Sequence, residues 1–405
     1  MITKPYDLVL FGASSFVGQI TARYLAQHYG SGSNLTWAIA GRSQQKLAEL
    51  KSSFGLKGSA LPIIVADANS EGELVAMCKQ ARVVISTVGP YDLYGSKLVD
   101  ACAKTGTDYV DLTGENLWVK SMIDQHEKAA QKSGARIIHG CGFDSIPSDM
   151  GVWFLQQHLK NTFGETANHI QMHVRAMKGG FSGGTVASLS NLFEKASSDK
   201  KLLRKLSDPY LLCPPNTPRQ AGQKPISSAS FDKKTQSWIA PFFMSPTNEG
   251  VVLRSNMFNH YADDFVYQEA MSFGNKTKSS PMAYLVSGSL KTFLGAMALK
   301  PTRTALKWVL PKPGEGPSKK SQEAGYFDLR FFAETRTGRV LNAQVKGIRD
   351  PGYGATARML AEAAICLTQM PKSDNTGGIW TPASIFDQRL IDRLTQNAGM
   401  TFQVL

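Results

Sequence analysis

A glycine-bounded turn near the N-terminus has residue types and spacing that can hold a phosphate group. It follows the apolar run Leu8–Phe11. The first glycine permits a tight turn, the last permits close packing of a helix on a sheet, and the helix start offers free N–H groups. Ser15 takes the place where such turns often have a central glycine, and its hydroxyl can bond a pyrophosphate. We predict dinucleotide binding by Gly12, Ala13, Ser14, Ser15, Phe16, Val17 and Gly18.

The residues after the second expected strand indicate which dinucleotide binds. Sites for NAD place an acidic residue about 20 residues after the glycine turn, where it accepts a hydrogen bond from the ribose 2′-hydroxyl. No acidic residue occurs in 35–48, and the chain instead has Arg42, Ser43 and Lys46 there. An arginine suits a 2′-phosphate, because its guanidinium binds two oxygens at once. We therefore predict NADP; the alternative is that Arg42 is only a solvated residue at a helix start.

Loops after later strands are expected to complete the pocket, because ligands bind at the carboxyl edge of open parallel sheets. Asp67 follows the third expected strand and is predicted beside the adenine. The loop after the fourth strand is predicted along the nicotinamide ribose and contains Thr87, Val88, Gly89, Pro90 and Tyr91.

Reduction of a double bond by a nicotinamide also needs a proton source. The candidates are Tyr94, Asp144, Ser145 and water, and the sequence does not rank them. Each side chain has a simpler alternative role. Tyr94 can merely cover the nucleotide, and Asp144 and Ser145 can cap the helix that begins at Ile146.

Contacts to substrate are predicted from a strand end and from a glycine-rich helix start, namely Cys141, Gly183, Gly184 and Thr185. The N–H groups of such a helix start can bind a carbonyl oxygen; plain helix capping and a small buried thiol are the alternatives. Asp111 and Glu115 flank a turn and are expected to brace it. His169 and His173 have no Glu or Cys nearby to form a ligand set, so we predict no metal.

Alternating strands and helices over the first 140 residues are expected to position these loops. Six short runs rich in β-branched residues are separated by helical periods, which is typical of a parallel sheet covered on both faces. The predicted strands are Asp7–Phe11, Thr36–Ala40, Leu61–Ala66, Arg82–Thr87, Tyr109–Leu112 and Ala135–His139. The fold class is thus α/β, with an N-terminal doubly wound Rossmann sheet.

After about residue 146 the pattern changes to one typical of an α+β domain. Strands are expected at 169–176, 265–274, 325–335 and 339–348, with a hairpin between the last two. Seven of the 19 prolines fall in 207–250, so we predict an irregular excursion there. Final helices are expected near 355–369 and 382–397. The predicted domains are 1–147, 148–349 and 350–405, the last packing back on the first.

Composition excludes several classes of protein. With 42% hydrophobic and 19% charged residues among 405, the chain can bury a large core. Five scattered cysteines without a CxxC pair indicate a reducing cytosol rather than a disulfide framework. No signal peptide or membrane span is expected. The net charge is +13, but no nucleic-acid-binding motif accompanies it, so nucleic acid is not an expected partner.

The charge excess is confined to the second half of the chain. Residues 1–150 carry 14 basic and 14 acidic side chains, whereas 276–320 carries nine basic ones and a single acid. Within 281–312, Val286, Leu290 and Phe293 fall on one helical face. Such a helix can lie on an anionic membrane or receive an acyl chain; the alternative is that it packs on the second domain. We expect a cytoplasmic protein, with attachment to the inner face of the plasma membrane as an option.

Seven motifs spread over the chain resemble those of the saccharopine dehydrogenase-like oxidoreductases, and among these most of all the branch with the bacterial trans-acting enoyl reductases. They are the turn 12–18, Ser86–Tyr91, Gly106–Glu115, Gly142–Asp149, Ser182–Thr185, Gly314–Ser318 and Asp350–Ala357. The short-chain reductases are disfavoured, because no Tyr-x-x-x-Lys spacing occurs.

The resemblance implies a Rossmann domain, an inserted second domain and NAD(P)H-linked reduction. In the enoyl reductase branch it implies lipid or polyketide substrates, so we expect an NADP-dependent enoyl reductase acting on a hydrophobic acyl group. An acyl group bound to a carrier or to coenzyme A is one option for this substrate. A homodimer through the second domain is a further implication. The alternative function is a nucleotide-bound, lipid-associated scaffold without turnover.

Overall fold

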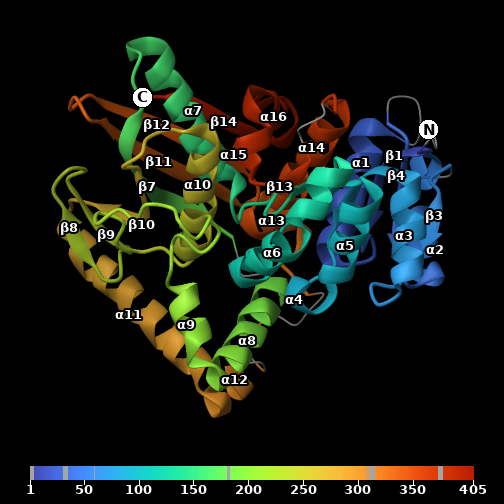
Figure 1. Ribbon diagram of the computed structural model, residues 1–405. Coiled ribbons are helices and arrows are strands. Elements are labelled where there is room, and N and C mark those ends of the chain that lie inside the picture. The colour runs from blue at the N-terminus through green and yellow to red at the C-terminus, as the bar shows by residue number, and fades with distance from the viewer. Residues whose placement is uncertain are drawn as a thin grey trace.

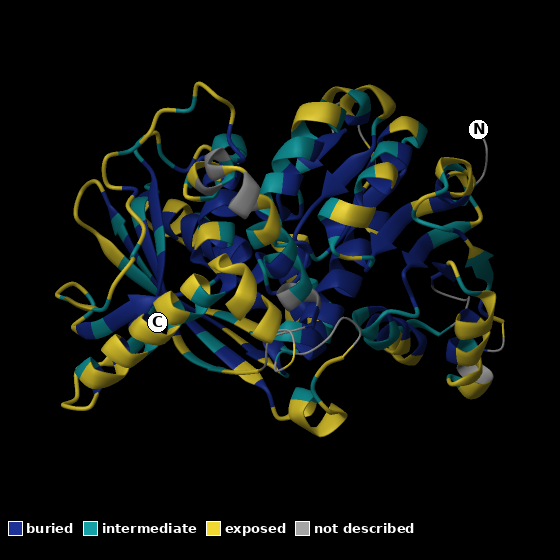
Figure 2. Ribbon diagram, turned by 90° about the horizontal axis from the view of Figure 1, so that it is seen from below, coloured by how far each residue is buried: buried dark blue, intermediate teal, exposed yellow. Residues whose placement is uncertain are grey.

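Two seven-stranded sheets form the framework of the molecule (Figure 1). A computed structural model describes residues 4–30, 35–58, 60–179, 183–306, 308, 310, 315–372 and 377–405. Figure 2 shows buried strands inside a layer of half-buried and exposed helices. The first sheet lies near the N-terminus, and the second is built mainly from residues after 166.

The first sheet is parallel throughout and has the strand order β13-β6-β5-β4-β1-β2-β3. Six of its strands follow the predicted runs: β1 Tyr6–Phe11, β2 Trp37–Gly41, β3 Ile63–Val65, β4 Ala81–Ser86, β5 Asp108–Val110 and β6 Arg136–Ile138. The predicted Rossmann architecture is therefore confirmed. The seventh strand, β13 (Gly378–Trp380), comes from near the C-terminus and pairs with β6.

Helices cover both faces of this sheet because its strands are apolar on both sides. Leu8 and Leu10 pack with α1 (Phe16–Tyr29) and α14 (Thr356–Gln369). Val9 and Phe11 belong to the core on the opposite face, which has α3 (Glu71–Gln80), α5 (Ser96–Thr105) and α6 (Asn116–Ser133). Shorter elements complete the domain: α2 Gln44–Ser52, a 3-10 turn at Gly55–Gly58 and α4 Tyr91–Tyr94.

The second sheet is mixed, with the order β14-β12-β11-β7-β10-β9-β8. Only β7 and β10 run parallel, and the predicted β11–β12 hairpin is present. The strands are β7 Ala167–Lys178, β8 Ser230–Asp232, β9 Ser237–Pro241, β10 Val266–Gly274, β11 Tyr326–Thr335, β12 Val340–Ile348 and β14 Met400–Val404. Strand β14 was not predicted, so the C-terminal segment adds one strand to each sheet.

Helices α7 (Ile146–Phe163) and α10 (Ser245–Asn259) pack on this sheet. The short α15 (Pro382–Ile385) packs on α7 and α10, and α16 (Asp387–Arg393) packs on α7 and α14. Helix α11 (Ser279–Ala298) contacts β8, β9 and β10 and runs along the lower left margin in Figure 1. The remaining helical elements are α8 Gly183–Ser198, α9 Lys200–Leu206, α12 Lys300–Leu306, α13 Lys319–Glu323 and π-helical turns at Pro351–Ala355 and Leu394–Ala398.

The prediction of an irregular excursion over 207–250 is wrong for its second half. Strands β8 and β9 and the start of α10 lie within it. Prolines are compatible with these elements at the positions they occupy. Pro241 is the last residue of β9 and Pro246 lies in the first turn of α10, where the missing N–H has no intrahelical partner to lose.

No single described helix has the length and apolar composition needed to cross a membrane. Helices α11 and α12 reach that composition only when taken together, and they are bent by 109° relative to each other.

Candidate active site

The glycine turn between β1 and α1 has the geometry expected of a phosphate cradle. Gly12 has φ of +83°, a left-handed conformation that favours glycine. A Cβ added to Gly18 would lie 2.2 Å from the Gly12 carbonyl oxygen, so only glycine lets α1 start this close to the turn. The N–H groups of Phe16 and Val17 make no hydrogen bond with the described part of the chain. The residues present thus fit a dinucleotide pyrophosphate.

Ser15, the departure from glycine in the turn, has a structural role. Its hydroxyl accepts a hydrogen bond of 3.0 Å from the Gly18 N–H and lies 3.0 Å from the Thr87 hydroxyl. Thr87 in turn donates to the Gly12 carbonyl at 2.9 Å. The serine therefore caps α1 and ties the turn to the loop after β4, while the next two N–H groups stay available.

The residues predicted at the adenine end lie where the sequence places them, at the carboxyl ends of β2 and β3. Arg42 and Lys46 are exposed, and Ser43 caps α2 by accepting from the Lys46 N–H. Asp67 accepts from the Asn69 N–H at 2.8 Å, so it orders its own loop. None of these four residues lines the main cavity. Their contacts with a cofactor stay a prediction. The exposed guanidinium of Arg42 at the end of β2 is compatible with it.

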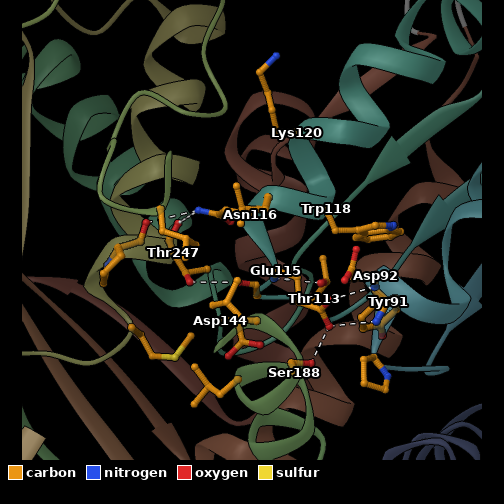
Figure 3. A pocket seen from close by; sticks show the side chains of 18 of the residues that line it. Tyr91, Asp92, Thr113, Glu115, Asn116, Trp118, Lys120, Asp144, Ser188 and Thr247 are labelled. Atoms are coloured by element: carbon orange, nitrogen blue, oxygen red, sulfur yellow. Dashed lines mark hydrogen bonds between the residues drawn. The ribbon is translucent and has the colours of Figure 1, made fainter. Parts of the chain in front are cut away.

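A cavity of about 1300 Å³ opens beside the glycine turn, between the first sheet and the second domain. Its near wall contains Ser15, Phe16, Val17, Thr87 and the segments after β4 and β5. Figure 3 labels Tyr91 and Glu115 in these segments. The far wall comes from α8, α9 and the segment 207–219. Much of the lining is apolar: Leu112, Phe143, Met177, Leu189, Leu192, Phe193, Leu202, Leu206, Phe243, Met244 and Leu294.

Glu115 joins the two walls of the cavity. Its carboxylate accepts hydrogen bonds from the Tyr91 N–H at 3.0 Å and the Asp92 N–H at 2.9 Å. It also accepts one of 2.6 Å from the Ser188 hydroxyl on α8, as Figure 3 shows. Burial raises the pKa of Glu115, although these donors favour its charged form. The Glu115 carboxylate therefore ties the start of α4 to α8, rather than its own turn as expected from the sequence.

Tyr91 lines the cavity but is held in a largely buried position. Its hydroxyl donates to the Ser86 carbonyl at 2.9 Å, and its ring packs near Trp118. Burial raises the pKa of the Tyr91 phenol well above its usual range. Tyr91 is therefore a neutral wall residue, and its contact with a cofactor stays a prediction.

Asp144 is the predicted proton donor that reaches the cavity. It is half-buried at the carboxyl end of β6 and lies among the labelled side chains of Figure 3. Burial raises the pKa of Asp144 to about 7, and the nearby negative charge of Asp111 adds to this shift. At neutral pH the carboxyl is therefore present in both protonated and charged forms, which suits a general acid.

Asp111 is fixed beneath the cavity by four donors. The N–H groups of Thr113 and Gly140 donate to one oxygen at 3.1 and 2.9 Å. The other oxygen accepts from the Tyr109 hydroxyl at 3.0 Å and lies 2.7 Å from Nδ1 of His139. Asp111 braces its turn as expected, and it also supplies the charge that acts on Asp144.

Tyr94, Ser145, Cys141 and Gly183, which were also predicted at the site, lie outside the cavity lining. Tyr94 is 42% exposed on α4. Ser145 is buried and donates to the Gly140 carbonyl. Cys141 is buried next to the Ile138 carbonyl, and burial raises its thiol pKa well above the usual range. Gly183, at the start of α8, donates to the Tyr353 hydroxyl at 2.9 Å. Of the catalytic and substrate-contacting candidates whose side chains the structure describes, Asp144 alone lines the cavity.

Helix α8 forms one cavity wall, but the residues through which it does so were not predicted from the sequence. Gly184 lies in its first turn, and the side chain of Thr185 is outside the described part of the structure. Ser188 and the apolar residues Leu189, Leu192 and Phe193 line the cavity. The spacing of these three apolar residues is that of one helical face and was the available signal. No group of three or more His, Cys, Asp or Glu in the described residues has a metal-binding arrangement.

A glycine turn after the first strand and a cavity at the carboxyl edge of a parallel sheet are typical of dinucleotide-dependent enzymes. Residues 8–138 match the model of the saccharopine dehydrogenase NADP binding domain. A trans-acting enoyl reductase of Mycobacterium bovis is 36% identical over 407 residues, covering 96% of both chains. One of Mycobacterium ulcerans is 36% identical over 410 residues, covering 97% of this chain and 96% of its own.

A Mycobacterium tuberculosis relative that carries the same name provisionally is 38% identical over 99% of this chain and 97% of its own. Among solved structures, apo saccharopine dehydrogenase (L-Glu forming) from Saccharomyces cerevisiae superposes with a TM-score of 0.57 at 12% identity, covering 99% of this chain and 100% of that one. This likeness shows the shared fold. The chain belongs to the trans-acting enoyl reductase family of saccharopine dehydrogenase-like proteins, and it is an NAD(P)-dependent oxidoreductase with an NADP-binding domain.

Proposed function

We propose that this protein uses NADPH to reduce the carbon–carbon double bond of a 2-enoyl thioester that carries a long hydrophobic acyl chain. The observation that supports it most is the placement of Asp144, with a pKa of about 7, in a large and mostly apolar cavity beside the glycine turn. The names of the relatives point to the same bond. An acyl chain is the kind of ligand that such a lining binds.

NADPH, when bound, supplies the hydride that reduction of the double bond requires. The apolar walls from α8 and α9 exclude water and align the acyl chain. As the β carbon of the substrate gains the hydride, the α carbon becomes basic, and Asp144 gives it a proton. Asp144 is left as a carboxylate, and its pKa of about 7 lets it regain a proton from neutral solvent.

Isotope transfer tests this function. The protein is supplied with NADPH deuterated at either face of C4 and with trans-2-enoyl thioesters of increasing chain length. We expect one face only to deliver deuterium, to the β carbon of the product, and kcat/KM to rise with chain length because longer chains bury more apolar surface in the cavity. Bound NADPH without labelled product from any chain length would contradict the proposal and favour a scaffold without turnover.

Arg42 tests the cofactor part of the proposal separately. Removing its guanidinium removes a charged hydrogen bond to the 2′-phosphate, which corresponds to about 10- to 100-fold in affinity. Arg42→Ala is therefore expected to weaken NADPH binding by that factor and to leave NADH binding unchanged, as measured by titration of nucleotide fluorescence. Equal loss of both nucleotides would contradict the assignment, and Arg23→Ala on the exposed side of α1 is the matched control.

A further inference from the structure

Helix α11 packs on the second sheet through only one side. Its fully buried residues include Ala283, Ser287 and Met297, which are spaced as one helical stripe. The residues of the apolar face expected from the sequence, Val286 and Leu290, are half-buried beside this stripe. The simpler expectation, packing on the second domain, accounts for this side of the helix.

Exposed large apolar side chains also lie on α11 and on the segment that follows it. We call the α11–α12 surface the set Met282, Tyr284, Leu285, Leu294, Leu299 and Trp308. The described residues have 15 exposed large hydrophobic side chains, and six of them lie within the span 282–308. A cluster of exposed apolar side chains of this kind marks an interaction site.

The charge around the α11–α12 surface has one sign. Residues 270–314 contain no acidic side chain and seven basic ones. The exposed lysines in the described part are Lys276, Lys278, Lys291 and Lys300, at both ends of α11 and along it. Arg303 is buried and donates to the Met297 carbonyl at 2.9 Å, so it ends α11 rather than facing solvent.

This charge pattern argues against a second copy of the chain as the occupant, because a twofold contact would place lysines against lysines. It favours an anionic partner. The 20 residues of α11 extend over about 30 Å, along the margin of the molecule in Figure 1. Exposed apolar residues that include Tyr284, with lysines at both ends of α11, are typical of a helix lying in a membrane interface. Trp308 adds an aromatic side chain beyond the 109° bend between α11 and α12.

We propose that the α11–α12 surface docks on the anionic face of a phospholipid bilayer. Leu285, Leu299 and Trp308 enter the interface, and the lysines contact lipid phosphates. Leu294 belongs both to this surface and to the cavity lining, so docking brings the cavity next to the membrane. The inference goes beyond the proposed function, since it does not require the substrate to be a lipid.

Sedimentation of the full chain with vesicles tests this proposal. Vesicles of phosphatidylcholine alone are compared with vesicles containing about one third phosphatidylglycerol. We expect binding to the anionic vesicles only, weakened by high salt because the lysine contribution is screened, with a blue shift of tryptophan fluorescence that Trp308→Phe abolishes.

Matched substitutions test whether vesicle binding depends on the α11–α12 surface rather than on exposed apolar residues in general. Leu285→Gln with Leu299→Gln is expected to lower vesicle affinity by about 10-fold or more, because two large apolar groups no longer enter the interface. The control is Val340→Gln with Ile348→Gln, since these residues are 64% and 58% exposed, against 63% and 62% for the leucines. The control is expected to bind as the parent does.

The outcomes are distinguishable from those of the enzymatic test. The leucine variants keep the cavity lining, so their turnover of a soluble enoyl thioester in vesicle-free buffer is expected to match the parent. Absence of vesicle binding, equal binding of leucine and control variants, or capture of an acidic protein in place of vesicles would overturn the docking proposal. None of these results would affect isotope transfer from NADPH.

Discussion

Burial raises the pKa of four carboxyls to about 7, yet only one of these four lines the cavity. Burial raises the pKa of Asp144 and of Glu269 to about 7. Asp144 lines the cavity beside the first sheet. Glu269 lies in β10 of the second sheet with no exposed surface, and its carboxylate accepts from the Tyr267 hydroxyl at 2.7 Å and from Asn248 at 2.9 Å.

Asp149 and Glu249 belong with Glu269. Burial raises the pKa of both to about 7. Asp149 accepts from the Ala383 N–H at 2.8 Å, and Glu249 accepts from the Ser245 hydroxyl. None of these three carboxyls lines the cavity. Among these four carboxyls with a pKa of about 7, access to the cavity selects Asp144 as the candidate acid. Glu115 also lines the cavity and has a raised pKa, but three donors hold its carboxylate in place.

The largest expected effect comes from removing the Asp144 proton. Asp144→Asn keeps the shape of the side chain but cannot act as an acid. Because general acid catalysis contributes about 10²- to 10⁴-fold, we expect kcat with an enoyl thioester to fall at least 100-fold while the Kd of NADPH is unchanged. Steady-state kinetics and nucleotide titration measure the two quantities.

Glu269→Gln is the matched control, since it removes an equally perturbed carboxyl that does not reach the cavity. It is expected to change kcat by less than about three-fold, because the general acid stays intact. A larger loss of kcat from Glu269→Gln than from Asp144→Asn would contradict the assignment of Asp144 as the general acid.

The pH dependence of turnover is the next largest effect. A general acid must be protonated, so activity is present below the pKa of Asp144 and is lost as the pH rises through about 7. Above that value kcat/KM is expected to fall about 10-fold per pH unit. Glu269→Gln should show the same profile, and Asp144→Asn a low, flat one. A profile for the parent that stays level up to about pH 9 would exclude Asp144 as the acid.

Much of the fold could be predicted because the first domain follows local rules. Six runs of β-branched residues became β1 to β6, since a parallel sheet covered on both faces demands continuous apolar strands. Strands β13 and β14 are short and pair with partners far away in sequence. Nothing in a segment of three or five residues indicates which sheet it joins, so these two strands escaped prediction.

The candidate site was predictable where residues follow strands. The glycine turn, Thr87 and Asp144 all lie at the carboxyl edge because parallel strands end there together. The far wall was not predictable, because Ser188 reaches Glu115 only through the packing of the second domain on the first. The same packing decides that Asp144 is accessible while the adjacent Ser145 is not, a distinction that sequence position alone does not contain.

The smallest expected effect is on stability, and it comes from the raised pKa of Glu269. Its pKa is about 4.5 when unfolded and about 7 in the fold, so the folded state binds the proton more tightly. The stabilisation is fully present below the lower value and is lost as the pH rises through about 7. Between about pH 6 and 8, the free energy of unfolding should fall by about 1 kcal/mol from this group.

Glu269→Gln should remove that part of the pH dependence, as measured by urea unfolding at several pH values. Glutamine can replace the protonated acid here. The glutamine still accepts from the Tyr267 hydroxyl. In the described residues Oδ1 of Asn248 is buried without a hydrogen-bond partner. If the Asn248 amide flips, this oxygen can accept from the amide of the glutamine. If Glu269→Gln left the slope of unfolding free energy against pH unchanged, Glu269 would be charged in the fold. Its pKa would then not be raised as that of Asp144 is.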